Sequence, residues 1–151
     1  MVGEEVPALV EGDPGRVLQV LLNFLGNAVK FTKQGEIEAR VALLSSTEKT
    51  VELQFEVRDT GIGISSENRQ SLFDSFTQAD SSTTRKYGGS GLGLAISQRL
   101  AVLMNGDVEI ESTPGIGSTF RVNLRFDRFR GPALSGSTPV EAIKGSNVLL
   151  L

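Results

Sequence analysis

The sequence predicts a two-layer α/β sandwich, in which helices cover one face of a mixed, mostly antiparallel sheet. Segments 36–44, 50–59 and 107–126 alternate charged and apolar residues with a period of two, which is typical of half-buried strands. Segments 13–32 and 94–104 instead repeat apolar residues at the spacing of an amphipathic helix. Strands that are apolar on one face need helices on that face only, and this requirement predicts the two layers.

The first expected elements are a short strand over 6–13 and a helix over 13–32. Asp13 suits the N-cap of this helix because its side chain can accept a backbone hydrogen bond, and Pro14 suits the first helical position. The apolar residues that form the predicted core stripe of the helix are Val17, Leu21, Phe24, Leu25 and Ala28.

The remaining elements follow in chain order. The polar turn SSTEK joins the strands 36–44 and 50–59 into a hairpin. A short helix is expected around 66–73, and an irregular stretch over 77–91. The second long helix ends at Met104, before Asn-Gly, and the turn PGIG divides the last pair of strands.

The C-terminal residues depart from the alternating pattern. Residues 127–145 have the composition of a linker, and residues 146–151 form a short apolar segment typical of a new strand. We therefore expect one domain over 1–126, a linker, and the truncated start of a second domain.

Composition and charge exclude several classes of function. Lys plus Arg total 15 against 18 for Asp plus Glu, a net charge of −3, so we expect no nucleic-acid partner and no direct membrane contact. Without cysteine or histidine the chain has no thiol nucleophile, no disulfide, no serine or cysteine triad and no imidazole metal ligand. The groups that remain for catalysis are carboxylates, amides, lysines, the backbone and a hard metal ion. Any reaction would therefore depend mainly on the positioning of the reacting groups.

Polar residues on the first long helix form one candidate site. Asn23, Asn27 and Lys30 recur at i, i+4 and i+7 and therefore share a stripe, nearly opposite the apolar one. Asparagine is a mediocre helix former, so two asparagines in the middle of a helix indicate that their amide oxygens have a functional role. A solvated helix face is the alternative interpretation.

Two glycine clusters form the other candidates. Asp59 ends a strand and could accept a hydrogen bond from an exocyclic amine, while Gly61 and Gly63 would let a flat ring pack against backbone; an ordinary turn is the alternative. The stretch YGGSGLGL at 87–94 precedes a helix, where free amides suit a phosphate; a flexible loop is the alternative. Neither cluster matches the phosphate-loop or dinucleotide-binding motif.

In order, these motifs closely resemble the successive boxes of sensor histidine kinase ATP-binding domains, over about residues 6–126. The matching motifs are Asn-x-x-x-Asn-Ala-x-Lys-Phe at 23–31, Asp-x-Gly-x-Gly at 59–63, Phe-x-x-Phe at 73–76, Gly-Gly-x-Gly-Leu-Gly-Leu at 88–94 and Gly-x-Gly-Ser-Thr-Phe at 115–120. This family belongs to the GHKL superfamily and has the Bergerat fold, an α/β sandwich. The terminal KGSNVLLL also resembles the first strand of a receiver domain, which implies a hybrid kinase as the parent protein.

The resemblance implies ATP and Mg²⁺ as ligands. Asn27 would offer its amide oxygen to Mg²⁺, Asn23 would support the phosphate and metal cluster, and Lys30 would reach the phosphates; these are the implied catalytic residues. Asp59 would bind the adenine amino group, with Thr119 assisting through a hydroxyl or a water. The implied nucleotide-binding set is completed by Phe31, Gly61, Gly63, Ile64, Tyr87, Gly89, Gly91, Leu92, Gly93 and Leu94. Residues 77–91 would form an ATP lid.

The resemblance also implies an activity and partners. The domain would donate the γ-phosphoryl group of ATP to a histidine on a separate upstream dimerisation domain, in a phosphorelay with a receiver domain or response regulator. We expect a cytoplasmic location, in a parent protein that can be anchored in the inner membrane.

Two alternative functions stay open at this stage. The first is a hydrolase of the same superfamily. Those enzymes place a glutamate base four residues before the metal-binding asparagine, where this chain has Asn23, and a neutral amide cannot take a proton from water. The second is a module that binds nucleotide without kinase activity.

Overall fold

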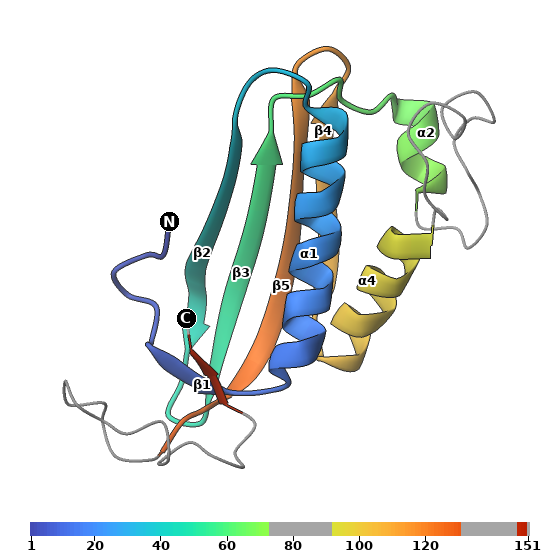
Figure 1. Ribbon diagram of the computed structural model, residues 1–151. Coiled ribbons are helices and arrows are strands. Elements are labelled where there is room, and N and C mark those ends of the chain that lie inside the picture. Colours follow the sequence, from blue (N-terminus) through green and yellow to red (C-terminus); the bar gives the residue numbers. More distant parts are fainter. Residues whose placement is uncertain (73–91, 131–147, 151) are drawn as a thin grey trace.

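The computed structural model describes residues 1–72, 92–130 and 148–150, which form one sheet with helices on a single face (Figure 1). The predicted α/β sandwich is therefore confirmed. The elements, in chain order, are β1 Leu9–Glu11, α1 Pro14–Phe31, β2 Ile37–Ser46, β3 Thr50–Asp59, α2 Ser66–Ser71, α4 Leu92–Leu103, β4 Asp107–Thr113, β5 Gly117–Arg128 and β6 Val148–Leu150.

The sheet has the strand order β2-β3-β5-β1-β6, and β4 pairs with β5 off this path. Every ladder between these strands is antiparallel. The parallel contribution is an isolated bridge between Val2 and Val41, beside the β2 edge. The strand ladders that the structure describes are thus all antiparallel, which agrees with the mostly antiparallel sheet that the alternating sequence pattern predicts.

Helix α1 begins and ends close to its predicted bounds. The Asp13 side chain accepts a hydrogen bond from the Arg16 backbone N–H at 3.1 Å, and Pro14 opens the helix. The buried residues of α1 are Val17, Val20, Phe24 and Ala28, whereas Leu21 and Leu25 are partly buried against the core. The core stripe is therefore rotated slightly toward Val20, which the sequence analysis did not include.

The core lies between α1, α4 and the helix-facing side of β3 and β5. Alternate residues of β3 are buried from Val51 to Val57, and their antiparallel partners on β5 are buried as well. The Phe24 ring packs on the Phe120 ring with centroids 5.4 Å apart. This packing joins the middle of α1 to the central strand.

The opposite face of the sheet is polar. Arg121 on β5 donates to Glu56 at 2.7 Å and forms an ion pair with Glu111 at 3.0 Å. The guanidinium of Arg121 lowers the pKa of the Glu111 carboxyl through their hydrogen bond. A face built from such pairs needs no covering layer, which explains why the helices lie on one side only.

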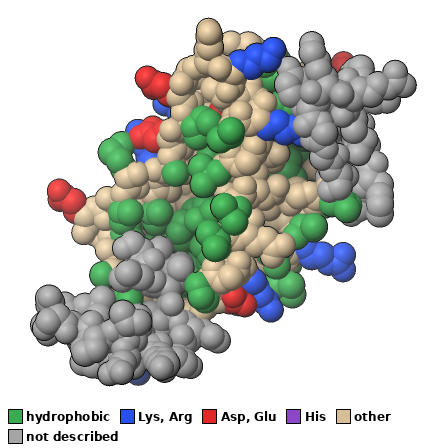
Figure 2. All heavy atoms as spheres, viewed as in Figure 1, with side chains coloured by type: hydrophobic (Ala, Val, Ile, Leu, Met, Phe, Trp, Pro, Cys, Tyr) green, Lys and Arg blue, Asp and Glu red, His purple; other side chains and the backbone are tan. Residues whose placement is uncertain are grey.

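One flank of α1 stays apolar and uncovered. The side chains of Leu18, Leu22 and Val29 are all more than half exposed. Figure 2 shows hydrophobic side chains gathered near the middle of this helix-bearing face. The side of α1 opposite the core is therefore apolar, not the polar stripe that the sequence analysis placed there.

The ends of several elements differ from the expected bounds. The first strand is confined to Leu9–Glu11, and α4 begins at Leu92 instead of residue 94. β5 continues to Arg128, two residues past the expected domain end, and Val148–Leu150 pair with β1 as the strand β6 of the same sheet. Among the helices that the structure describes, none has the length and apolar character to cross a membrane.

We predict that Phe24→Ala lowers the free energy of unfolding by about 3–5 kcal/mol, because it removes a fully buried ring from the contact between α1 and β5. Urea denaturation measures this change. The matched control on the same helix is Leu22→Ala, an exposed position where a change of about 0.5 kcal/mol or less is expected. Equal losses in the two variants would contradict the assignment of the core.

Candidate nucleotide site

Three segments that carry predicted site residues meet at one end of the sandwich. Figure 1 shows the C-terminal end of α1, the end of β3 and the β4–β5 turn together at this end. The Ile62 N–H donates to the Phe31 carbonyl at 3.3 Å, which ties the loop after β3 to α1. The Gly115 N–H donates to the Ile62 carbonyl at 2.8 Å, which ties the same loop to the β4–β5 turn.

Asp59, the last residue of β3, presents a buried carboxylate. It shares the helix-facing side of the strand with Val57, and its side chain is only 4% exposed. Its Oδ1 accepts hydrogen bonds from the Gly61 N–H at 2.8 Å and from the Thr32 hydroxyl at 3.5 Å. Among the described residues, Oδ2 has no hydrogen-bond donor. One carboxylate oxygen therefore holds the loop, and the other remains able to accept a hydrogen bond from a ligand.

The glycines beside Asp59 are required by close backbone approach. A Cβ on Gly61 would lie 2.8 Å from Asp59 Oδ1, and one on Gly63 would overlap the Thr113 carbonyl. Gly63 also has a φ of +67°, which favours glycine. The loop after β3 thus fits tightly against the start of the β4–β5 turn.

Hydroxyl groups complete this end of the site. Ser112 Oγ accepts a hydrogen bond from the Ile64 N–H at 2.8 Å and lies 3.0 Å from Ser118 Oγ. Ser118 is directly opposite Asp59 in the β3–β5 ladder and is 7% exposed. The sequence analysis named neither serine. The alternation of β5 was the available signal, because Ser118 has the same parity as the buried Phe120.

Thr119 is the next residue of β5 after Ser118. It pairs with Arg58, so it belongs to the polar face of the sheet, whereas Asp59 and its partner Ser118 belong to the helix-facing side. Ser118 is the hydroxyl residue on the same side of the sheet as Asp59, and Asp59, Ser118 and Thr119 all line one hollow of about 470 Å³.

The amide stripe of α1 lies beside α4. Asn23 Nδ2 donates a hydrogen bond to Ser97 Oγ on α4 at 2.8 Å. Asn27 and Lys30 follow at i+4 and i+7 on this flank and are half-buried. Lys30 Nζ lies 4.8 Å from the centroid of the Phe31 ring, which is also half-buried. Asn23 is therefore part of the contact between two helices, which rules out a simple solvated face for this residue.

The start of α4 contributes the glycine-rich motif. Leu92 and Gly93 open the helix, and Leu94 packs against the core. The N-terminal end of a helix carries the positive end of the helix dipole, which favours an anion. Tyr87, Gly89 and Gly91, with the expected lid over 77–91 and the motif at 73–76, lie outside the described residues.

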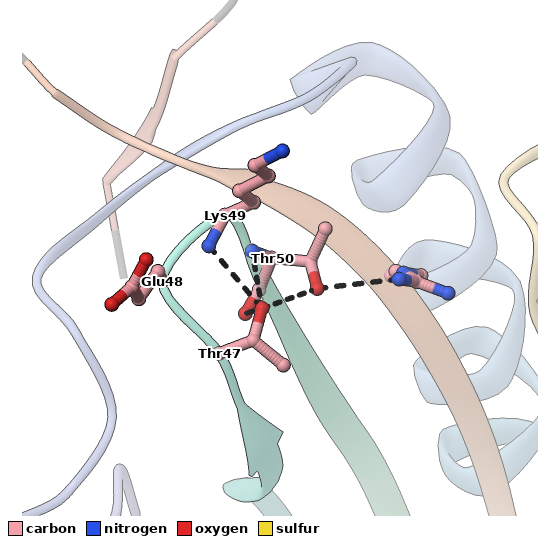
Figure 3. A pocket seen from close by; sticks show the side chains of 5 residues that line it. Thr47, Glu48, Lys49 and Thr50 are labelled. Carbon is pink, nitrogen blue, oxygen red and sulfur yellow. Dashed lines mark hydrogen bonds between the residues drawn. The ribbon is translucent and has the colours of Figure 1, made fainter.

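A shallow hollow of about 400 Å³ lies at the other end of β3 (Figure 3). It is lined by the turn from Thr47 to Thr50 and by Arg125. Thr47 Oγ1 accepts hydrogen bonds from the N–H groups of Lys49 at 3.2 Å and Thr50 at 3.0 Å. These bonds are those of an ordinary side-chain-stabilised turn. The hollow contains none of the predicted site residues.

Known proteins share this architecture and sequence. A family model described as "Histidine kinase-, DNA gyrase B-, and HSP90-like ATPase" matches residues 12–128. Hybrid signal transduction histidine kinase F of Dictyostelium discoideum is 41% identical over 152 residues, covering 100% of this chain. Sensor protein GacS of Pseudomonas syringae pv. syringae is 45% identical over 130 residues, covering 86% of this chain. Full-length ShkA, solved in complex with AMPPNP, matches with a TM-score of 0.71 and 34% identity, covering 89% of this chain and 27% of ShkA.

The fold and these matches define a domain of the Bergerat type. The chain belongs to the family of histidine kinase-, DNA gyrase B- and HSP90-like ATPases, and its curated relatives named above are a hybrid histidine kinase and a sensor protein. The resemblance predicted from the motifs is confirmed. The chain spans 14% of the length of each of the two curated relatives.

We predict that Gly63→Ala destabilises the fold more than Gly115→Ala. Both glycines have positive φ values, +67° and +77°, so alanine introduces about 1–2 kcal/mol of backbone strain at either position. Only at Gly63 does the new Cβ meet another group, the Thr113 carbonyl, which adds about 1–3 kcal/mol of overpacking. Thermal unfolding of the two variants measures the difference, and equal midpoints would show that the loop does not pack as described.

Proposed function

We propose that this domain binds ATP with Mg²⁺ and donates the γ-phosphoryl group to a histidine on another domain. The observation that carries the proposal is the buried Asp59 carboxylate, which keeps one oxygen available beside backbone that only glycine can form. The family match and the similarity to ShkA, which was solved with AMPPNP, support a nucleotide as the ligand.

Asp59 is suited to the adenine end of the nucleotide. Its Oδ2 would accept a hydrogen bond from the exocyclic amine, a charge-assisted bond that distinguishes adenine from guanine, which presents a carbonyl at this position. Gly61 and Gly63 let the loop after β3 fold closely against Phe31 and Thr113, which holds the backbone beside the Asp59 carboxylate. The Ser118 hydroxyl, next to Asp59 across the ladder, would add a second polar contact directly or through a water.

The polar flank of α1 is suited to the phosphate end. No cluster of three or more carboxylates that could hold a metal ion exists among the described residues, so the site would rely on amide and phosphate oxygens. Mg²⁺ takes oxygen ligands and usually keeps waters and phosphates, so the Asn27 amide oxygen fits as a single protein ligand. Asn23 would support this cluster. Lys30 would place a positive charge near the phosphates, and the N–H groups at the start of α4 would bind phosphate oxygens.

The side chains favour transfer over hydrolysis. Bound Mg²⁺ would neutralise negative charge on the phosphoryl oxygens, and the protein would supply alignment. Asn23 is a neutral amide and cannot act as a base toward water. The sequence contains no histidine, so the phosphoryl acceptor would belong to another domain of the parent protein. We propose a histidine-bearing dimerisation domain as that acceptor, and a receiver domain or response regulator as the next partner.

We predict that Asp59→Asn lowers the affinity for ATP by about 1.5–3 kcal/mol, because it replaces a charge-assisted hydrogen bond with a neutral one. The fold should survive, since the asparagine Oδ1 can still accept the hydrogen bond from Gly61. Isothermal titration calorimetry measures the affinity, and Asp107→Asn on the exposed β4 is the control. Equal ATP affinities in the Asp59 variant and the original chain would reject the adenine contact.

We predict that the chain incubated with γ-labelled ATP and Mg²⁺ gains no phosphohistidine, because it contains no histidine. When the parent protein's dimerisation domain is added as a second polypeptide, acid-labile label should appear slowly on that polypeptide. Transfer is slow because separation removes the effective concentration that a tether provides. Acid-stable label on this chain, or rapid phosphate release without an acceptor, would contradict histidine kinase activity.

A further inference from the structure

The contact between α1 and α4 contains a polar pair that fold stability does not explain. Asn23 Nδ2 donates to Ser97 Oγ at 2.8 Å, and Ser97 is 1% exposed. A hydrogen bond within a protein contributes only about 0.5–1.5 kcal/mol net, and an apolar pair of the same shape can be equally stable. The neighbouring buried position on α4, Ala101, is apolar. The pair therefore suggests a requirement on the orientation of the Asn23 amide.

Gly93 shapes the other half of this contact. It lies four residues before Ser97 on α4, so the two residues share the helix face that meets α1. A Cβ on Gly93 would overlap Asn23 Oδ1. Both ends of the amide are thus placed by α4: Nδ2 by the Ser97 hydroxyl, and Oδ1 by the bare backbone at Gly93.

We propose that Ser97 is a positioning residue that fixes which atom of the Asn23 amide faces the first turn of α4. This inference rests on the proposed function, in which that turn receives the phosphates. With Nδ2 held by Ser97, the amide presents its oxygen, an acceptor, to the region where Mg²⁺ and its waters would lie. Ser97 touches no part of the nucleotide and acts only through Asn23.

The proposal makes the effect of Ser97 specific to the phosphate end. Asp59, which would bind adenine, lies at the end of β3 and has no contact with the Asn23–Ser97 pair. Loss of the Ser97 hydroxyl should therefore weaken binding of ATP with Mg²⁺ and leave binding of adenosine, which has no phosphates, unchanged. A general loosening of the fold would weaken both ligands.

The test compares Ser97→Ala with the original chain. The dissociation constant of ATP with Mg²⁺, measured by calorimetry, should rise about threefold to tenfold, the range that one hydrogen bond supplies. The dissociation constant of adenosine, measured by NMR titration, should stay the same. The matched control is Ser45→Ala, which removes a serine hydroxyl that is hydrogen-bonded to Glu52 on the exposed part of β2. It should change neither constant.

A double-mutant cycle identifies the route of the effect. In the Asn23→Ala background, Ser97→Ala should produce no further loss of affinity for ATP with Mg²⁺. The proposal is overturned if Ser97→Ala leaves that affinity unchanged, weakens both ligands equally, or retains its full effect without the Asn23 amide. If the original chain itself binds neither ATP nor adenosine, the proposed function fails together with this inference, an outcome that differs from all three.

Discussion

The ladder between β3 and β5 is the constraint on which the other parts of the structure depend. Its unbroken antiparallel register runs from Thr50 paired with Asp127 to Asp59 paired with Ser118. Because side chains alternate, the same register that buries Phe55 and Val57 also brings the Asp59 carboxylate to the helix-facing side. A slip of one residue would exchange the two faces and move Asp59 to the polar side of the sheet. The core and the candidate site are therefore set by one pairing.

Helix α1 contributes to both the core and the candidate site because one of its sides is apolar and the adjacent side is polar. Phe24 and Ala28 anchor it to the sheet, and this packing fixes the direction in which the adjacent flank points. That flank carries Asn23, Asn27 and Lys30, and Asn23 contacts α4 at Gly93 and Ser97. Rigid elements thus bring the Asn23 amide and the proposed phosphate-binding turn together, which suits a reaction that depends on alignment and charge.

The fold and the loop that follows Asp59 could be predicted from sequence because both depend on local patterns. Period-two alternation identifies β3, which ends at Asp59. The closely spaced glycines Gly61 and Gly63 then indicate a tight loop directly after the strand. Strand parity adds Ser118, which pairs with Asp59, as a second hydroxyl residue beside Thr119. The role of Ser97 could not be predicted, because its contact with Asn23 joins residues 74 positions apart and leaves no periodic signal. The same holds for the rotation of α1 toward Val20.

The central claim is that nucleotide binds at the Asp59 end of the sandwich. NMR chemical-shift mapping on the ¹⁵N-labelled chain, titrated with a non-hydrolysable ATP analogue and Mg²⁺, tests it most directly. The account predicts the largest backbone shifts at Gly61 and Gly63, with further shifts at Asn27 and Gly93 and none in the turn from Thr47 to Thr50 (Figure 3). Shifts centred on that turn, or shifts absent from the loop after β3, would contradict it.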